Sequence, residues 1–115
     1  FNLLGKKQLN KSLKLGRSLV LQDTTMVNLL YPLTEFFQEL LFIKIFNGTN
    51  SFKKGYSRLS PSVNKKLPNY AKNFKNKEIV FALKRLGQID EKLKTSRIKD
   101  EPAITEFIYA TLSNG

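Results

Sequence analysis

The stretch IVFALKRLGQIDEKLK, residues 79–94, decides the fold of this chain. Its apolar residues recur at the spacing of one face of an α-helix: Ile79, Ala82, Leu83, Leu86, Ile89 and Leu93. An amphipathic helix of this kind is stable only when its apolar face packs against other elements. The stretch therefore predicts a helix that contributes one side of a shared core.

Similar patterns lie on both sides of this stretch. Apolar residues at helical spacing predict helices over 7–21 and 26–46 before it, a helix that begins at Ser60-Pro61, and a last helix that begins at Asp100. The 26–46 segment is apolar on nearly all sides, which is typical of the central helix of a bundle. No strand-like alternation of useful length competes. We therefore expect an all-α fold, a bundle of about five helices that residues 1–115 form as a single helical domain.

Two helix ends carry local signals. The first turn, Phe1 to Leu4, resembles the tail of a helix, and we expect Gly5 to close it in the left-handed conformation. Asn76 is the expected N-cap of the helix that follows it. Because the chain starts at Phe1 within an apolar turn, we expect it to be a fragment of a longer protein.

The composition excludes several kinds of site. The chain contains no cysteine and no histidine, which excludes disulfides and removes both the usual zinc ligands and the usual general base at neutral pH. We therefore expect no catalytic residues, no metal and no cofactor. The longest apolar run, Met26 to Phe46, is interrupted by polar and charged residues and by Pro32, so we expect no membrane-spanning segment.

The charge is strongly positive. Twenty Lys and Arg against nine Asp and Glu give a formal net charge of +11, and no acidic residue lies between Leu40 and Lys77. This block either forms a solvated basic surface or faces nucleic acid phosphates. The candidate phosphate-facing residues are Lys53, Lys54, Arg58, Lys65 and Lys66.

Asp90 and Lys94 form a second candidate feature. They are separated by four residues, so their side chains meet on one surface of the 77–94 helix. The pair is either an ordinary surface ion pair or a structural one, since Asp90 lies on the same side as the apolar face. This position favours the structural role, so we expect Asp90→Ala to lower the stability of the domain by about 1 to 3 kcal/mol.

The order of these segments resembles a known family. The segments that carry the resemblance are Ser60-Pro61, Lys65-Lys66, Ala71, Phe74, Ile79, Ala82-Leu83, Leu86, Asp90, Leu93-Lys94 and Glu101, preceded by Phe1, Leu3-Leu4, Leu13 to Leu19, Phe37, Leu40-Leu41 and Lys44. In this order they resemble the C-terminal region of the delta subunit of bacterial DNA polymerase III. The resemblance covers nearly the whole chain.

The resemblance implies a non-catalytic oligomerisation domain. In that family, this helical domain packs against its counterparts in a collar of the clamp loader, which places the sliding clamp on primed DNA. The implied partners are the other clamp-loader subunits, with the sliding clamp and DNA contacted through the parent protein. The parent would be a cytoplasmic subunit of a DNA-directed DNA polymerase holoenzyme, a nucleotidyltransferase. The alternative is a free-standing basic helical protein that binds nucleic acid, although the phenylalanines have core spacing rather than the spacing of base-stacking platforms.

Phe81 is the candidate contact with another subunit. At about 100° per residue, Val80 and Phe81 each lie about 130° from the centre of the apolar face. A helix that is apolar on a second side needs a second neighbour, either another helix of the bundle or another subunit. Val80 could meet the 26–46 helix, whereas the polar residues around Phe81 favour a contact outside the domain.

Overall fold

The computed structural model describes residues 1–45 and 60–112, and α-helices account for nearly all of them. The helices are α1 (Asn2–Gly5), α2 (Leu9–Ser18), α3 (Met26–Ile45), α4 (Pro61–Ala71), α5 (Asn76–Lys94) and α6 (Asp100–Leu112), with a π-helical turn η1 (Leu19–Asp23) after α2. No strand occurs in the described ranges. The prediction of an all-α bundle is confirmed, with five helices of ten or more residues and the short α1.

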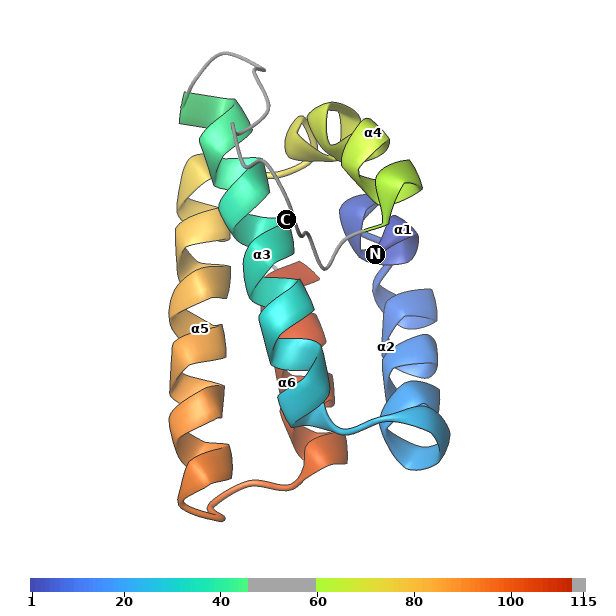
Figure 1. Ribbon diagram of the computed structural model, residues 1–115, viewed down its shortest axis with the longest axis vertical. Coiled ribbons are helices and arrows are strands. Elements are labelled where there is room, and N and C mark those ends of the chain that lie inside the picture. The colour runs from blue at the N-terminus through green and yellow to red at the C-terminus, as the bar shows by residue number, and fades with distance from the viewer. Residues whose placement is uncertain (46–59, 113–115) are drawn as a thin grey trace.

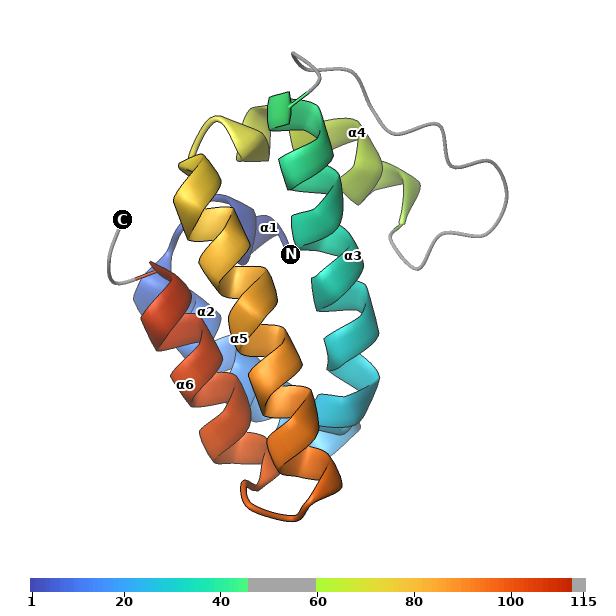
Figure 2. The ribbon, with the colours of Figure 1, turned by 90° about the vertical axis from the view of Figure 1, so that its left-hand side faces the viewer.

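Helix α3 is the central element, as its all-round apolar sequence predicts. It packs against α4, α5 and α6, while α2 lies along α6 on the other side of the bundle (Figure 1). Seen after a quarter turn, α5 lies in front, with α6 on one side of it and α3 on the other (Figure 2). Helix α5 therefore has one side in the core and one side that no described helix covers.

Aromatic rings join the helices at the centre. The Phe37 ring of α3 lies 5.7 Å from the ring of Phe74 and 5.9 Å from the ring of Phe107, both in edge-to-face geometry. Phe36 extends the cluster to Phe1, whose ring it stacks on at 5.0 Å. Edge-to-face and offset-stacked pairs of this kind add to the stabilisation that burial alone gives. The cluster links α3 to α6, to the α4–α5 corner and to the start of the chain.

Local sequence signals predicted some helix ends and missed others. Ser60 is the N-cap of α4, where its Oγ accepts a hydrogen bond from the Val63 amide at 3.3 Å, and Pro61 follows as the first helical residue. The cap of α5 is Lys75 rather than Asn76. There the Lys75 amide donates to Glu78 Oε1 at 2.6 Å, so a side chain in the first turn satisfies the exposed backbone donor.

The prediction for Gly5 was wrong. The residue with positive φ at this corner is Lys7, with φ of 57°, whereas Gly5 ends α1. Gly5 lies against the ring of Tyr70, where a Cβ would come within 2.7 Å of both ring Cδ atoms. Its carbonyl accepts a hydrogen bond from Asn73 Nδ2 at 2.8 Å. The glycine is therefore required for the close packing of α1 on α4, not for the backbone conformation of a cap.

Candidate interaction surface

The uncovered side of α5 exposes two large apolar side chains. Phe81 is 54% exposed and Val80 is 49% exposed, although both lie in the middle of a helix whose other apolar residues are mostly buried. Isolated exposed apolar residues are common on soluble proteins. Aromatic residues are enriched at protein–protein interfaces, however, so Phe81 on the basic outer side of α5 is the stronger candidate of the two.

Phe81 faces the side of α5 that borders α6. It lines a small hollow of about 50 Å³ together with Ala110 and Thr111 of α6 and with Glu78, Ala82 and Arg85 of α5. The buried hydroxyl of Thr111 has no hydrogen-bond partner among the described residues. The hollow beside Phe81 is therefore lined by both apolar and polar side chains from the two helices.

Val80 faces the opposite side, which borders α3. Val80, Gly87 and Lys94 are spaced by seven residues and so share one stripe of α5. Lys94 lies near Tyr31 of α3, which marks this stripe as the α3 side. The hydrogen bond and charge of Asp90 raise the pKa of Lys94, to which Tyr31 adds a smaller contribution in the same direction.

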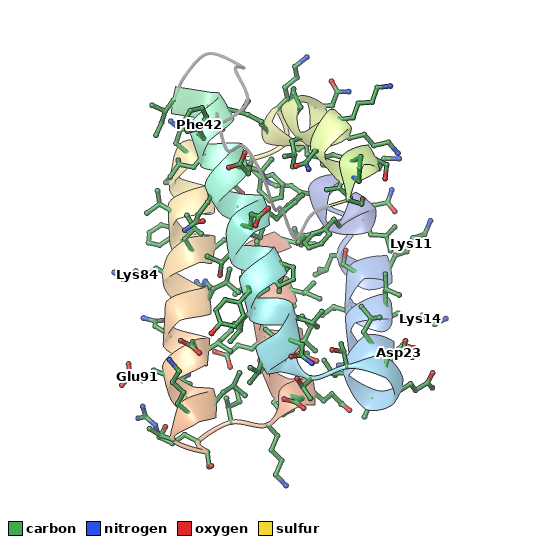
Figure 3. The ribbon with its side chains drawn as sticks, in the orientation of Figure 1. Lys11, Lys14, Asp23, Phe42, Lys84 and Glu91 are labelled. Carbon is green, nitrogen blue, oxygen red and sulfur yellow. The ribbon has the colours of Figure 1, made fainter. Side chains whose placement is uncertain are left out.

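The charge between these two sides is positive. Lys77 and Lys84 are exposed, and Figure 3 shows Lys84 pointing away from the bundle. Within residues 1–45 and 60–112 neither lysine forms an ion pair, whereas Glu91 on the same side accepts a weak contact from Arg97 at 3.4 Å. An incoming surface would therefore meet uncompensated positive charge beside the apolar residues.

The predicted ion pair between Asp90 and Lys94 has a distance of 3.0 Å between Oδ2 and Nζ. The two side chains are 39% and 70% exposed, so the pair lies at the surface beside the α3–α5 boundary. Surface pairs of this geometry contribute little to stability. The structural role that the sequence predicts for Asp90 is not tested by this geometry, but the exposure of both side chains favours a small contribution to stability.

The candidate phosphate-facing residues divide into two groups. Lys65 and Lys66 are exposed on α4, and neither is paired with an acidic residue in the described part of the chain. Lys53, Lys54 and Arg58 lie outside the described residues. The structure does not test whether these residues contact phosphate, so this role also stays a prediction.

One cluster could not be seen in the sequence. Lys7 Nζ lies 2.8 Å from Glu78 Oε2, with side chains only 18% and 9% exposed, and 5.0 Å from the centre of the Phe74 ring. Burial favours a raised pKa for Glu78, but the hydrogen bonds from Lys7 and Lys75 and the charges of both lysines lower it below its ordinary value. The pair joins residues 71 positions apart and fixes the α1–α2 corner to the start of α5.

Two further features of the described residues bear on function. No group of three or more His, Cys, Asp or Glu side chains converges there in a way that could hold a metal ion. Among the helices of residues 1–45 and 60–112, none has the length and apolar character that crossing a membrane requires.

Comparison with known proteins gives one match. A family model described as the C-terminal domain of the DNA polymerase III delta subunit matches residues 1–111. No curated protein and no solved structure matches the chain. The match covers both the helices that form the core and the exposed side of α5.

Proposed function

The chain belongs to the family formed by the C-terminal domain of the DNA polymerase III delta subunit, and we propose that it is the oligomerisation domain through which its parent protein joins the collar of the clamp loader. Domains of this family are non-catalytic parts of the clamp loader. In this role the domain supports loading of the sliding clamp, and its partners are the other clamp-loader subunits. The parent would act in the cytoplasm as a subunit of the DNA polymerase holoenzyme, a nucleotidyltransferase, and would contact the clamp and DNA elsewhere.

The observation that carries this proposal is the exposed Phe81 on the basic outer side of α5. The core of the described residues is closed without it, since Ile79, Ala82 and Leu86 of the same helix are the buried ones. A partner that covers a half-exposed aromatic side chain removes its apolar surface from water, and it does so at little conformational cost. Lys77, Lys84 and Arg85 around it favour a partner surface with acidic residues.

The test is Phe81→Ala in the full-length subunit, measured by assembly with the purified remaining subunits of the same clamp loader. We expect assembly to weaken by about 10- to 100-fold, the range of a truncated interface anchor. The melting temperature of the 115-residue chain should change little. Leu21→Ala is the matched control, because Leu21 in η1 is 66% exposed and lies away from α5.

Three results would overturn the proposal. Normal assembly with lost stability would assign Phe81 to the core of the domain. Unchanged assembly and unchanged stability would leave Phe81 without a role in either. A loss of assembly as large for Leu21→Ala would show that the effect is not specific to α5.

A second proposal concerns the basic residues of α4. Lys65 and Lys66 can meet DNA phosphates, which would give weak binding without sequence preference. The affinity of such binding should fall steeply as the salt concentration is raised. The double variant Lys65→Gln, Lys66→Gln should reduce the slope of log affinity against log salt concentration by the amount expected for about two phosphate contacts. Sequence-specific binding that survives physiological salt would instead favour a free-standing nucleic-acid-binding protein.

A further inference from the structure

An apolar hollow lies between α2 and α3, with α6 behind it in the view of Figure 1. Its volume is about 110 Å³. All three helices contribute apolar side chains to its walls, among them Leu15 of α2, Leu29 and Leu33 of α3, and Ile104 and Ile108 of α6. Leu15 is 45% exposed, whereas Leu33 and Ile104 are buried. The hollow is therefore closed at its base and can be reached from solvent beside Leu15.

The close packing of α2 on α6 forms the base of this hollow. Gly16 of α2 lies directly against α6, where a Cβ would come within 2.7 Å of Ile108 Cδ1 and 2.9 Å of Ile104 Cγ1. Among the described helices, α2 has no comparable packing against α3. Helix α2 is thus fixed to α6 and stands apart from α3, and the leucines between them fill the space only in part.

Ser12 brings a polar group to these apolar walls. It lies four residues before Gly16, on the side of α2 that lines the hollow, and it is only 5% exposed. Its hydroxyl is buried and has no hydrogen-bond partner among the described residues. A buried hydroxyl without a partner is unfavourable, and most such groups in proteins are hydrogen-bonded. A molecule in the hollow that donates or accepts one hydrogen bond would satisfy it.

We propose that this hollow is a binding site for a small aromatic alcohol, with the ring between α2 and α3 and the alcohol hydroxyl on Ser12. An apolar cavity of about 150 Å³ lined by Leu, Ile and Phe binds benzene. A hollow of about 110 Å³ that opens to solvent has room for one ring of this kind. The apolar walls supply the affinity, and Ser12 selects the ligand that carries a hydroxyl, as single polar groups do in other apolar ligand sites.

The site is independent of the proposed function. Phe81 lies on α5 and does not line this hollow, and none of the basic residues considered for phosphate lines it either. Binding of a small molecule here requires no other subunit. It can therefore be measured on the 115-residue chain alone.

The test titrates this chain with phenol and with toluene, which has a similar size and no hydroxyl. Two-dimensional NMR spectra of the backbone amides measure binding. We expect both compounds to shift the amide signals of Leu29, Ile104 and their neighbours in a saturable way, because the apolar walls accept either ring. Amides of α5 that lie far from the hollow should not shift.

Ser12→Ala separates the hydroxyl from the walls. It should weaken phenol binding by about 3- to 10-fold, the value of one hydrogen bond, and leave toluene binding unchanged. The same variant should raise the melting temperature, because it removes an unpaired buried hydroxyl and because alanine favours the helix more than serine does. Weaker phenol binding by a more stable variant excludes misfolding as the cause.

Leu29→Phe places a larger side chain in the wall of the hollow and should weaken the binding of both compounds by about 10-fold or more. Val27→Phe is the matched control, because Val27 lies on the same helix, is 46% exposed and does not line the hollow. It should bind both compounds as the wild type does.

Absence of a saturable shift with phenol in the wild type would overturn the inference. Equal phenol affinities of the wild type and Ser12→Ala would do so too, and so would undiminished binding by Leu29→Phe or an equal loss with Val27→Phe. Each of these results leaves the proposed function standing, because that function is tested by assembly of Phe81→Ala with the other subunits.

Discussion

Gly5 and Gly87 lie in two regions of the molecule that differ in what surrounds them. At Gly5 the ring of Tyr70 occupies the space where a side chain would begin, and the Gly5 carbonyl is hydrogen-bonded by Asn73. At Gly87 that space is open. The first glycine is explained by contacts inside the domain, and the second is not.

The same contrast extends to the charged groups of each region. Near Gly5, Lys7 and Glu78 are nearly buried and paired with each other, and Lys7 also lies over the Phe74 ring. Near Gly87, Lys84 is exposed and unpaired within the described residues. The closed region holds the domain together, whereas no contact among the described residues depends on Gly87 or Lys84. Changes in the first should affect stability, whereas the proposed function predicts that changes on the outer side of α5 affect assembly.

Gly5→Ala should give the largest loss of stability. Its Cβ would overlap the face of the Tyr70 ring, which is held at the centre of the α1–α4 contact and cannot move without repacking. We expect the free energy of unfolding to fall by about 1 to 3 kcal/mol, as for other overpacked positions. Chemical denaturation of the 115-residue chain measures this. A stability equal to that of the wild type would show that the corner is loosely packed and would remove the contrast with Gly87.

Glu78→Gln should give a loss of stability comparable to that of Gly5→Ala. Removing one charge of a nearly buried pair leaves Lys7 with an uncompensated charge, which we expect to cost about 1 to 3 kcal/mol at pH 7. Glu106→Gln is the control, because its contact with Lys92 is 3.9 Å long and exposed. That variant should leave stability unchanged.

The loss for Glu78→Gln should depend on pH in a defined direction. The pKa of Glu78 is lower in the folded domain than its ordinary value, so the folded state favours the carboxylate. Its contribution is therefore complete above the unfolded pKa of about 4.3 and is lost as the pH falls through the lower folded pKa. Denaturation curves of the wild type and the variant should differ at pH 7 and converge near pH 2. A difference that stays constant over this range would contradict the role of the charge.

Asp90→Ala should give the smallest effect. Both members of its pair with Lys94 are substantially exposed, and alanine favours the helix more than aspartate does. We expect the melting temperature of the domain to stay within about 2 °C of the wild type. A larger drop would show that Asp90 is structural and would move it from the open region to the closed one.

The sequence predicted the features that depend on local spacing. The apolar stripe of 79–94, the all-round apolar 26–46 segment and the Ser60-Pro61 start all depend on residues within a few turns of each other, and α5, α3 and α4 confirm them. Turn chemistry alone gave the wrong reason for Gly5, because the ring that requires it belongs to α4.

The contacts between distant segments could not be predicted in the same way. Lys7 and Glu78 meet only because α1 packs on α4 and α5 starts beside it, and nothing in either local sequence indicates the other. Gly87 had a local signal, a glycine inside a helical pattern, but its meaning depends on the absence of neighbours around it. The exposure of Phe81 was indicated by its angle on the helix, whereas its position beside α6 required the fold.

The most direct test of the open region is the reactivity of its lysines toward an amine-acetylating reagent, read by mass spectrometry in the free and the assembled full-length subunit. Lys84 of α5 and Lys11 and Lys14 of α2 are all exposed, and Figure 3 shows them on opposite sides of the bundle. If the outer side of α5 binds a partner, assembly should lower the acetylation rate of Lys84 severalfold and leave those of Lys11 and Lys14 unchanged. An acetylation rate of Lys84 that is the same in both states would contradict the account.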